Sequence, residues 1–171
     1  MLDKKIASLL NEQIMKELYS AYLYLDMSNY YSDEALNGFE NWFYIQAQEE
    51  RDHAMLIRTY LLNNDEKITL LPIEAPQSGY GDFGEPLEKA LEHERTVTAS
   101  IHNIYKVAYE LGDFRTVEFL NWFVKEQGEE EKNTTDLVDR FRLFGKDAKG
   151  LYSLDQELTA RVYAAPTLQL S

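Results

Sequence analysis

The chain has 171 residues, of which 44% are hydrophobic and 27% charged, and this composition excludes a disordered or fibrous protein. Its 17 Lys and Arg against 30 Asp and Glu give a net charge of −13, which repels a phosphate backbone, makes nucleic acid a poor partner and attracts cations. Cysteine is absent, so disulfide scaffolds, zinc fingers, iron–sulfur clusters and thiol nucleophiles are also excluded.

Glycine and proline divide the chain into four long segments rich in Leu, Glu, Lys, Ala and Met, which are helix formers. We expect long helices over residues 3–32, 37–63, 85–111 and 113–144, and a short fifth helix over 151–162. Asp3 and Asp113 are suited to be N-caps, and Pro86 suits a first helical turn. The only hint of a strand pattern lies within residues 67–75.

The connections between these helices predict the topology. The first and second helices, and the third and fourth, are joined by very short turns, so each pair should form an antiparallel hairpin. Residues 64–84 between the pairs can extend over about 65 Å, whereas a helix of this length spans roughly 40 Å. This linker can therefore run along the whole bundle as one long crossover, although a floppy functional loop is the alternative. We expect residues 1–144 to form the bundle and 145–171 the fifth helix and tail.

Each long helix carries a carboxylate near the middle of the stripe that would face a bundle core. The stripe follows alternating four- and three-residue steps and is apolar toward its ends. The four acids are Glu17, Glu50, Glu94 and Glu130. At a rise of about 1.5 Å per residue they fall into one layer, within the error of the helix boundaries.

Four carboxylates in an apolar layer need compensation, because burying an unpaired charge is costly. No Lys or Arg lies on the four stripes, whereas His53 and Gln127 do, and both can coordinate metals. Four carboxylates and one neutral imidazole balance two divalent cations, so we infer a dinuclear metal site with Glu50 as its bridge. Such ligands suit Fe, Mn or Zn. The alternative is a hydrated polar layer held by hydrogen bonds.

Further acids lie beside the stripe. Glu49, Glu126 and Glu129 could form a third cation site that shares Glu130, although a solvated acidic face would have the same spacing. The four residues belong to two short acidic runs, one on the second helix and one on the fourth. Spacing alone leaves these two interpretations open.

Three other residues carry chemistry but are less constrained by their positions. Tyr24 lies two turns after Glu17, where its phenol could hydrogen-bond a ligand or supply an electron, but it is one of 12 tyrosines. His93 and His102 fall off the stripe, and we expect both to face solvent.

Together these residues resemble the bacterial non-haem ferritins. The matching positions are Glu17, Tyr24, the motif Glu50-Arg51-Asp52-His53, Glu94 and the run Glu126-Gln127-Gly128-Glu129-Glu130. The likeness covers essentially the whole chain, including the crossover and the short terminal helix. It implies an all-α, ferritin-like four-helix bundle with one long crossover and a short fifth C-terminal helix.

The resemblance also implies ligand roles. In that family Glu17, Glu50 and His53 bind one iron, and Glu50, Glu94 and Glu130 bind a second, with Gln127 nearby. A third iron site corresponds to Glu49, Glu126, Glu129 and Glu130. Tyr24 matches a tyrosine linked to iron oxidation.

The activity implied is that of a ferroxidase, which oxidises Fe(II) with O2 or H2O2 and stores ferric mineral inside a hollow homo-oligomer of twenty-four subunits. Bacterioferritins and rubrerythrin-like proteins carry a second Glu-x-x-His motif, where this chain has Gln127-x-x-Glu130. Arg51 stands where bacterioferritin has its haem methionine, so we expect no haem.

Two other functions stay open. A di-iron peroxidase or oxygenase would need a substrate pocket or an electron-donor domain, and no rubredoxin-like cysteine module is present. A non-catalytic helical scaffold would bind no stoichiometric iron and need not form a large shell. With no leader-like segment after Met1 and no apolar run long enough to span a bilayer, we expect a cytoplasmic protein without a membrane partner.

Overall fold

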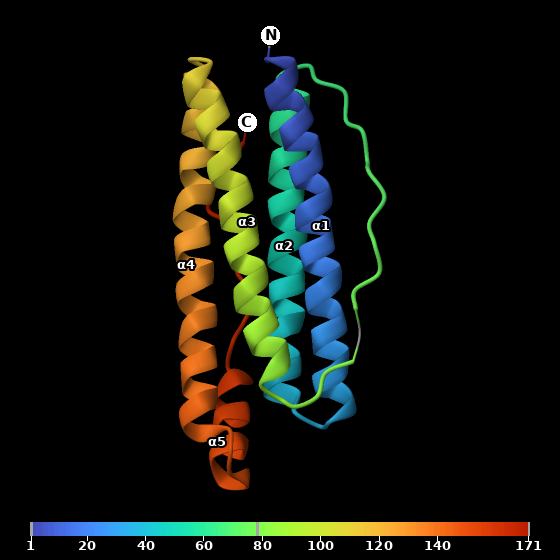
Figure 1. Cartoon of the computed structure of the whole chain (residues 1–171), viewed down its shortest axis with the longest axis vertical. Coiled ribbons are helices and arrows are strands. Elements are labelled where there is room, and N and C mark those ends of the chain that lie inside the picture. The colour runs from blue at the N-terminus through green and yellow to red at the C-terminus, as the bar shows by residue number, and fades with distance from the viewer. Residues whose placement is uncertain (1, 78, 171) are drawn as a thin grey trace.

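The computed structural model describes residues 2–77 and 79–170, and its helices form a four-helix bundle with a shorter helix across one end (Figure 1). The elements are α1 (Lys4–Asp33), α2 (Asn37–Asn63), α3 (Glu85–Glu110), α4 (Phe114–Phe144) and α5 (Ala148–Leu158). The predicted all-α bundle is therefore confirmed. None of these helices is both long and apolar enough to cross a membrane, within the described residues.

Two hairpins and one crossover give the bundle its topology. α1 packs on α2 and α3 packs on α4, each pair joined by a short turn. Residues 64–84 run the length of the bundle beside α1, so that α3 starts at the end opposite to where α2 stops (Figure 1). The crossover contains no strand among its described residues, so the hint of strand over 67–75 is wrong. Its backbone bonds to a side chain instead, since the N–H of Thr69 donates to Asn11 Oδ1 at 2.8 Å.

Local sequence explains where the helices begin. Asp3 and Asp113 cap α1 and α4 as predicted, each accepting a hydrogen bond from a backbone N–H of the first turn. Asp147 caps α5 in the same way, accepting from the backbone of Lys149 and Gly150. This cap starts α5 at residue 148 and not at the predicted 151, and the helix also ends earlier, at residue 158.

α2 has no capping side chain of its own and takes one from α5. Asp155 Oδ1 accepts hydrogen bonds from the backbone N–H groups of Gly38 at 2.7 Å and Phe39 at 3.1 Å. The buried carboxylate also meets the positive end of the α2 dipole. A Cβ at residue 38 would lie 1.7 Å from the backbone oxygen of Asp155, so only glycine allows this approach. The contact fixes α5 across the end of the bundle.

The apolar core is divided into two clusters, one toward each end of the bundle. The first cluster includes Ile6, Leu10, Ile14, Ile57, Leu61, Ile101, Ile104, Leu120 and Phe123. The second includes Tyr24, Met27, Tyr31, Phe39, Phe43, Leu87, Leu91, Leu137 and Leu154. Polar residues fill the layer between them.

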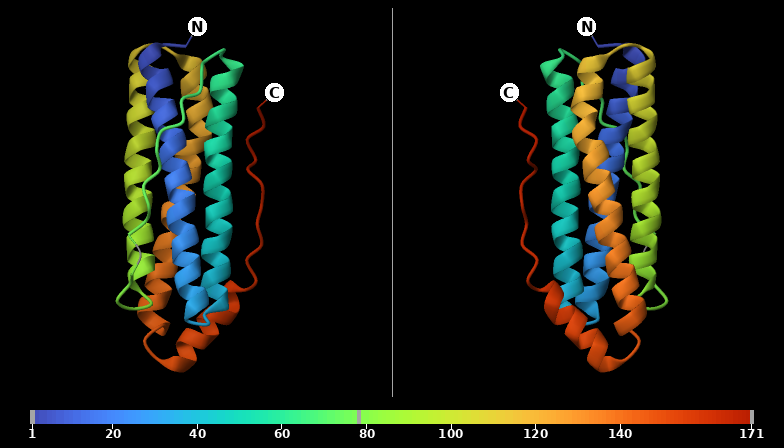
Figure 2. Two further views of the ribbon diagram at one scale, coloured as in Figure 1. Left: turned by 90° about the vertical axis from the view of Figure 1, so that its right-hand side faces the viewer. Right: turned by 90° about the vertical axis from the view of Figure 1, so that its left-hand side faces the viewer.

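After α5 the chain turns back along the bundle. Residues 159–170 form an extended tail that runs beside α2 toward the opposite end (Figure 2). The phenol of Tyr163 hydrogen-bonds to Asp52 of α2, and Trp122 Nε1 of α4 donates to Thr167 Oγ1 at 2.9 Å. The tail therefore bridges α2 and α4 along the face where these two helices lie next to one another.

Candidate metal centre

Each of the four long helices places one carboxylate in the polar layer between the two apolar clusters. The exposed fractions are 1% for Glu17, 0% for Glu50, 1% for Glu94 and 4% for Glu130. His53 is 2% exposed and lies one turn after Glu50 on α2. Groups this polar are rarely buried without a partner. The layer therefore calls for hydrogen-bond donors or positive charge to compensate its carboxylates.

The structure brings these side chains together in groups small enough to share an ion. Donor atoms of Glu17, Glu50 and His53 all lie within 4.8 Å of one another, and so do those of Glu50, Glu94 and Glu130. Glu50 belongs to both groups and stands between them. Two groups that could each hold a metal ion therefore share one carboxylate.

Several donor atoms in this layer are buried with no hydrogen-bond partner. They are Glu17 Oε2, both carboxylate oxygens of Glu50, and His53 Nδ1, which lies 3.4 Å from Glu50 Oε2 and would pair with it only if the imidazole were protonated. An unsatisfied buried polar atom costs about 1–3 kcal/mol, and more when it is charged. All four atoms belong to the group Glu17, Glu50 and His53 described above. Their donor chemistry, hard oxygen with one imidazole nitrogen, fits a divalent metal ion.

Other carboxylate oxygens of the layer are held by neutral donors. Gln13 Nε2 donates to Glu17 at 2.8 Å, Gln46 Nε2 to Glu130 at 2.6 Å and Gln127 Nε2 to Glu94 at 3.1 Å. The phenol of Tyr24 donates to the second oxygen of Glu94. Such partners orient a carboxylate without neutralising it, so the negative charge stays available for cations.

Burial and mutual repulsion perturb the acids of the layer. Desolvation raises the pKa of Glu50 well above its ordinary value, and the neighbouring charges of Glu94 and Glu17 add to this. Desolvation followed by the charge of Glu94 raises the pKa of Glu130 to about 8. The pKa of Glu94 is raised by burial too, despite hydrogen bonds from Tyr24 and Gln127 that lower it. A bound cation would remove this penalty by favouring the ionised forms.

The residues expected for a third site are only partly brought together. Donor atoms of Glu126 and Glu130 lie within 4.8 Å of one another and of His53. Glu129 is exposed, and Glu49 forms a salt bridge with Arg161 of the tail at 2.6 Å. Neither Glu49 nor Glu129 belongs to any of the three metal-capable groups found among the described residues.

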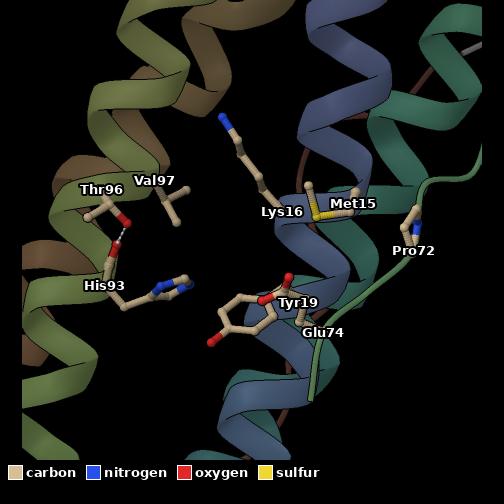
Figure 3. Close-up of a pocket in the computed structure, with 8 residues that line it drawn as sticks. All are labelled: Met15, Lys16, Tyr19, Pro72, Glu74, His93, Thr96 and Val97. Atoms are coloured by element: carbon tan, nitrogen blue, oxygen red, sulfur yellow. Dashed lines mark hydrogen bonds between the residues drawn. The ribbon is translucent and has the colours of Figure 1, made fainter. Parts of the chain in front are cut away.

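His93 does not face solvent as predicted, although His102 does. Its Nε2 lies 2.7 Å from Ser20 Oγ, and burial lowers its pKa to about 4. Figure 3 shows its ring directed toward Tyr19 across a cavity of about 470 Å³ between α1, α3 and the crossover. The prediction was wrong because the crossover covers this side of the bundle and turns an outer helix face into a partly buried one.

A hydrogen-bonded chain connects this cavity to the acid layer. Lys16, which lines the cavity (Figure 3), donates to Ser100 Oγ at 2.7 Å. Ser100 donates to Gln13 Oε1 at 2.6 Å, and Gln13 in turn holds Glu17. The cavity therefore lies beside the acid layer and contains none of its carboxylates.

Sequence reasoning missed three residues that act on the layer. Gln13 and Gln46 occupy the same core-facing stripes as Glu17 and Glu50, and this shared spacing was a signal that could have found them. Arg161 lies in an extended tail with no periodic pattern, so nothing in the sequence placed it beside the site.

Comparisons with known proteins agree with this geometry. The model of one protein family, the ferritin-like domain, matches residues 7–144. The chain is 38% identical over 156 residues to the bacterial non-heme ferritin of Campylobacter jejuni, across 91% of this chain and 93% of that protein. It is 36% identical over 163 residues to the bacterial non-heme ferritin of Staphylococcus epidermidis, across 95% and 98% of the two chains.

Solved structures give the same result in three dimensions. An open pore ferritin from the hyperthermophilic archaeon Archaeoglobus fulgidus superimposes with a TM-score of 0.93 at 40% identity, over 95% of this chain and 100% of that chain. An engineered closed form of the Archaeoglobus fulgidus ferritin gives a TM-score of 0.94 at 40% identity, over 96% and 100%. The similarity therefore extends over all four helices that supply the buried acids.

Proposed function

The chain belongs to the ferritin family, and from this membership we propose that it stores iron by oxidising Fe(II) at the buried acid layer. The reaction is that of a ferroxidase, with Fe(II) and either O2 or H2O2 as substrates. The ferric product is deposited as an oxy-hydroxide mineral inside a hollow assembly of identical subunits.

One observation carries this proposal. The layer holds four buried donor atoms with no hydrogen-bond partner, on Glu17, Glu50 and His53. A hydrated polar layer, which was the alternative, would satisfy such atoms by hydrogen bonds. Here the side-chain amides donate to Glu17, Glu94 and Glu130. No hydrogen bond from the described residues reaches the two oxygens of Glu50, the second oxygen of Glu17 or His53 Nδ1.

Each residue of the layer has a distinct role in this proposal. Glu17, Glu50 and His53 hold one Fe(II), and Glu50, Glu94 and Glu130 hold the other. Gln127 stays close to the second site through its bond to Glu94. Anionic oxygen ligands favour Fe(III) over Fe(II), so this ligand set makes oxidation more favourable. Two ions side by side can together supply the two electrons that reduce one O2 to peroxide.

Tyr24 contacts the second site through Glu94. Its phenol donates to a Glu94 carboxylate oxygen, and desolvation followed by the charges of Glu94 and Glu50 raises its pKa well above 10. Tyr24 therefore stays protonated at neutral pH and keeps Glu94 oriented. Its direct contact with Glu94, a proposed iron ligand, also suits it to deliver an electron.

An apolar surface supports assembly of the subunits. The groove between α1 and α2 is lined mainly by apolar side chains, among them Tyr22, Leu25 and Tyr44, which are 50%, 38% and 51% exposed. Ile73 of the crossover extends this surface. Contiguous apolar patches of this kind commonly mark interfaces. We propose that another copy of the chain covers it in a shell of twenty-four subunits, without haem.

A single experiment tests the function. Fe(II) is added without oxygen, air is admitted, oxidation is followed by absorbance and particle mass is measured in parallel. We expect rapid oxidation followed by mineral growth within a large particle. Continued consumption of peroxide or of an organic substrate without mineral would indicate a peroxidase or oxygenase instead, and no iron binding would indicate a scaffold.

Substitutions localise the activity within the same assay. Glu50→Ala and His53→Ala should slow rapid oxidation by about 100-fold while leaving the particle mass unchanged, because both residues hold the ions directly. Glu92→Ala is the matched control, since Glu92 lies on α3 two residues before Glu94 and is exposed. Wild-type oxidation kinetics in Glu50→Ala or His53→Ala would refute the assignment.

A further inference from the structure

The C-terminal tail, residues 159–170, places the positively charged side chain of Arg161 at the edge of the acid layer. Arg161 lies against α2, where Nη2 donates to Gln46 Oε1 and to Glu49 Oε2, both at 2.6 Å. Its Nη1 donates to the backbone oxygen of Trp42 at 3.1 Å, and the guanidinium carbon lies 4.7 Å from the centre of the Trp42 ring. Four separate contacts therefore fix the position of this guanidinium group.

The Arg161–Glu49 ion pair is sheltered from solvent. The side chain of Arg161 is 23% exposed and that of Glu49 is 19% exposed. At such positions an ion pair is screened much less than on the open surface, and breaking it by removing one partner is costly. Glu49 is thus already neutralised by a residue of the chain itself.

Arg161 also acts on the dinuclear layer through Gln46. The amide oxygen of Gln46 accepts from Arg161, so the amide nitrogen is turned toward α4 and donates to Glu130 Oε2 at 2.6 Å. A carboxylate accepts hydrogen bonds, so Glu130 itself favours the amide nitrogen, and Arg161 holds the amide in the same orientation from its oxygen end. Arg161 is therefore a positioning residue for Glu130.

These contacts bear on the third cation site implied by the resemblance. That site requires Glu49 together with Glu126, Glu129 and Glu130. The guanidinium group of Arg161 binds the carboxylate of Glu49. Glu49 belongs to none of the metal-capable groups of the described residues. The residues present therefore do not fit a third metal ion held by Glu49, and the remaining group of His53, Glu126 and Glu130 shares two of its three residues with the dinuclear layer.

We propose that Arg161 takes the place of a third metal ion in this protein, by neutralising Glu49 and orienting Glu130 through Gln46. Each subunit accordingly holds two divalent ions, both in the layer around Glu50. The inference rests on the proposed function, because it presupposes that this layer binds metal.

Zinc tests the inference without any oxidation chemistry. The assembled wild-type protein and its variants are crystallised and soaked in Zn²⁺, and the ions are located by anomalous scattering. We expect two zinc peaks beside Glu50 in the wild type and none on Glu49. Arg161→Gln removes the charge but keeps a hydrogen-bonding side chain, and we expect a third peak between Glu49, Glu126 and Glu130.

Two further variants separate charge from structure. Arg161→Lys keeps the positive charge, so it should restore the wild-type pattern of two peaks. Arg58→Gln makes the same charge change at an exposed position of α2, so it controls for a general gain in cation binding. Zinc bound per subunit, measured in solution after gel filtration, should rise by one in Arg161→Gln relative to Arg58→Gln.

The outcomes distinguish this inference from the proposed function. Zinc on Glu49 in the wild type, or no third ion in Arg161→Gln, overturns the role of Arg161 while the two peaks beside Glu50 leave the proposed function standing. Absence of zinc beside Glu50 in every variant overturns the proposed function and the inference with it.

Discussion

Glu50 differs from the other buried carboxylates because neither of its oxygens has a hydrogen-bond partner. Glu17 and Glu130 each have one oxygen fixed by an amide, whereas Glu94 has one oxygen held by Gln127 and the other by Tyr24. A bridging ligand needs both oxygens free, one for each ion, whereas a terminal ligand can use one oxygen and be held by the other. The distribution of hydrogen bonds therefore matches the roles proposed for Glu17, Glu50 and Glu130.

Because Glu50 is buried for binding and not for stability, we expect Glu50→Gln to stabilise the metal-free protein. The neutral amide avoids the desolvation of a carboxylate, and at pH 8 the gain should be about 1–3 kcal/mol. Thermal unfolding in the presence of a chelator measures it. Glu92→Gln, which alters an exposed acid on α3, should change the melting temperature little. A lower melting temperature for Glu50→Gln would contradict the prediction.

Tyr24→Phe tests whether orientation of Glu94 matters to the rate. The variant loses the hydrogen bond to Glu94 but keeps the ring, so the number of ions bound should not change. A loss of about 1 kcal/mol of positioning would slow oxidation roughly fivefold. Stopped-flow oxidation of Fe(II) gives the rate, and Tyr152→Phe at an exposed position of α5 is the control. Equal rates in the two variants would show that the phenol is not involved.

At the scale of the elements, the four long helices were predictable because each signal was local. Caps at Asp3 and Asp113, Pro86 in a first turn and an apolar stripe of helical period determined their ends to within one or two residues. The convergence of the four acids was predictable for the same reason, since rise per residue and hairpin topology determine height along a bundle.

What could not be predicted depends on contacts between elements distant in sequence. Asp155 caps α2 from α5, and Arg161 reaches Glu49 across more than a hundred residues. His93 is covered by the crossover, which has no periodic pattern that would show where it runs. No spacing rule links such partners, so the structure was needed to find them.

The cross-helix cap predicts that α5 depends on one carboxylate. Asp155→Ala leaves two N–H groups of α2 without their acceptor, and we expect a loss of about 1–3 kcal/mol of stability. Chemical denaturation of the metal-free protein measures this loss. Asp136→Ala, at an exposed residue of α4 that pairs with Lys132, should lose less than about 0.5 kcal/mol. Similar losses in both variants would argue against the cap.

For the whole molecule, the buried acids predict that the stability of the metal-free protein decreases as the pH rises. The pKa of Glu130 is about 8 in the folded protein, against an ordinary value of 4.5, so the folded state binds more protons than the unfolded state between these values. The contribution of Glu130 to the free energy of unfolding is at its full value below about pH 4.5. It is lost as the pH rises from there through about 8. The melting temperature of metal-free protein should therefore fall from pH 5.5 to pH 8.

Two controls identify the cause of this slope. Glu130→Gln should flatten it, because the amide does not titrate. Zn²⁺ should raise the melting temperature more at pH 8 than at pH 5.5, since metal binding must displace protons and is stronger when fewer are bound. A melting temperature of metal-free protein that rises with pH would contradict the prediction.

The division of the apolar core into two clusters has a consequence for cooperativity. Each cluster contains side chains from all four long helices, and what joins the two is a stratum of mutually repelling acids. With ions bound, the acids of that stratum hold the two clusters together, so that the bundle unfolds as one cooperative unit. Once the ions are removed, repulsion between the acids makes this stratum the least stable part of the bundle. Amide hydrogens in the two halves should then exchange with separate opening free energies, and loading with metal should merge them into a single value.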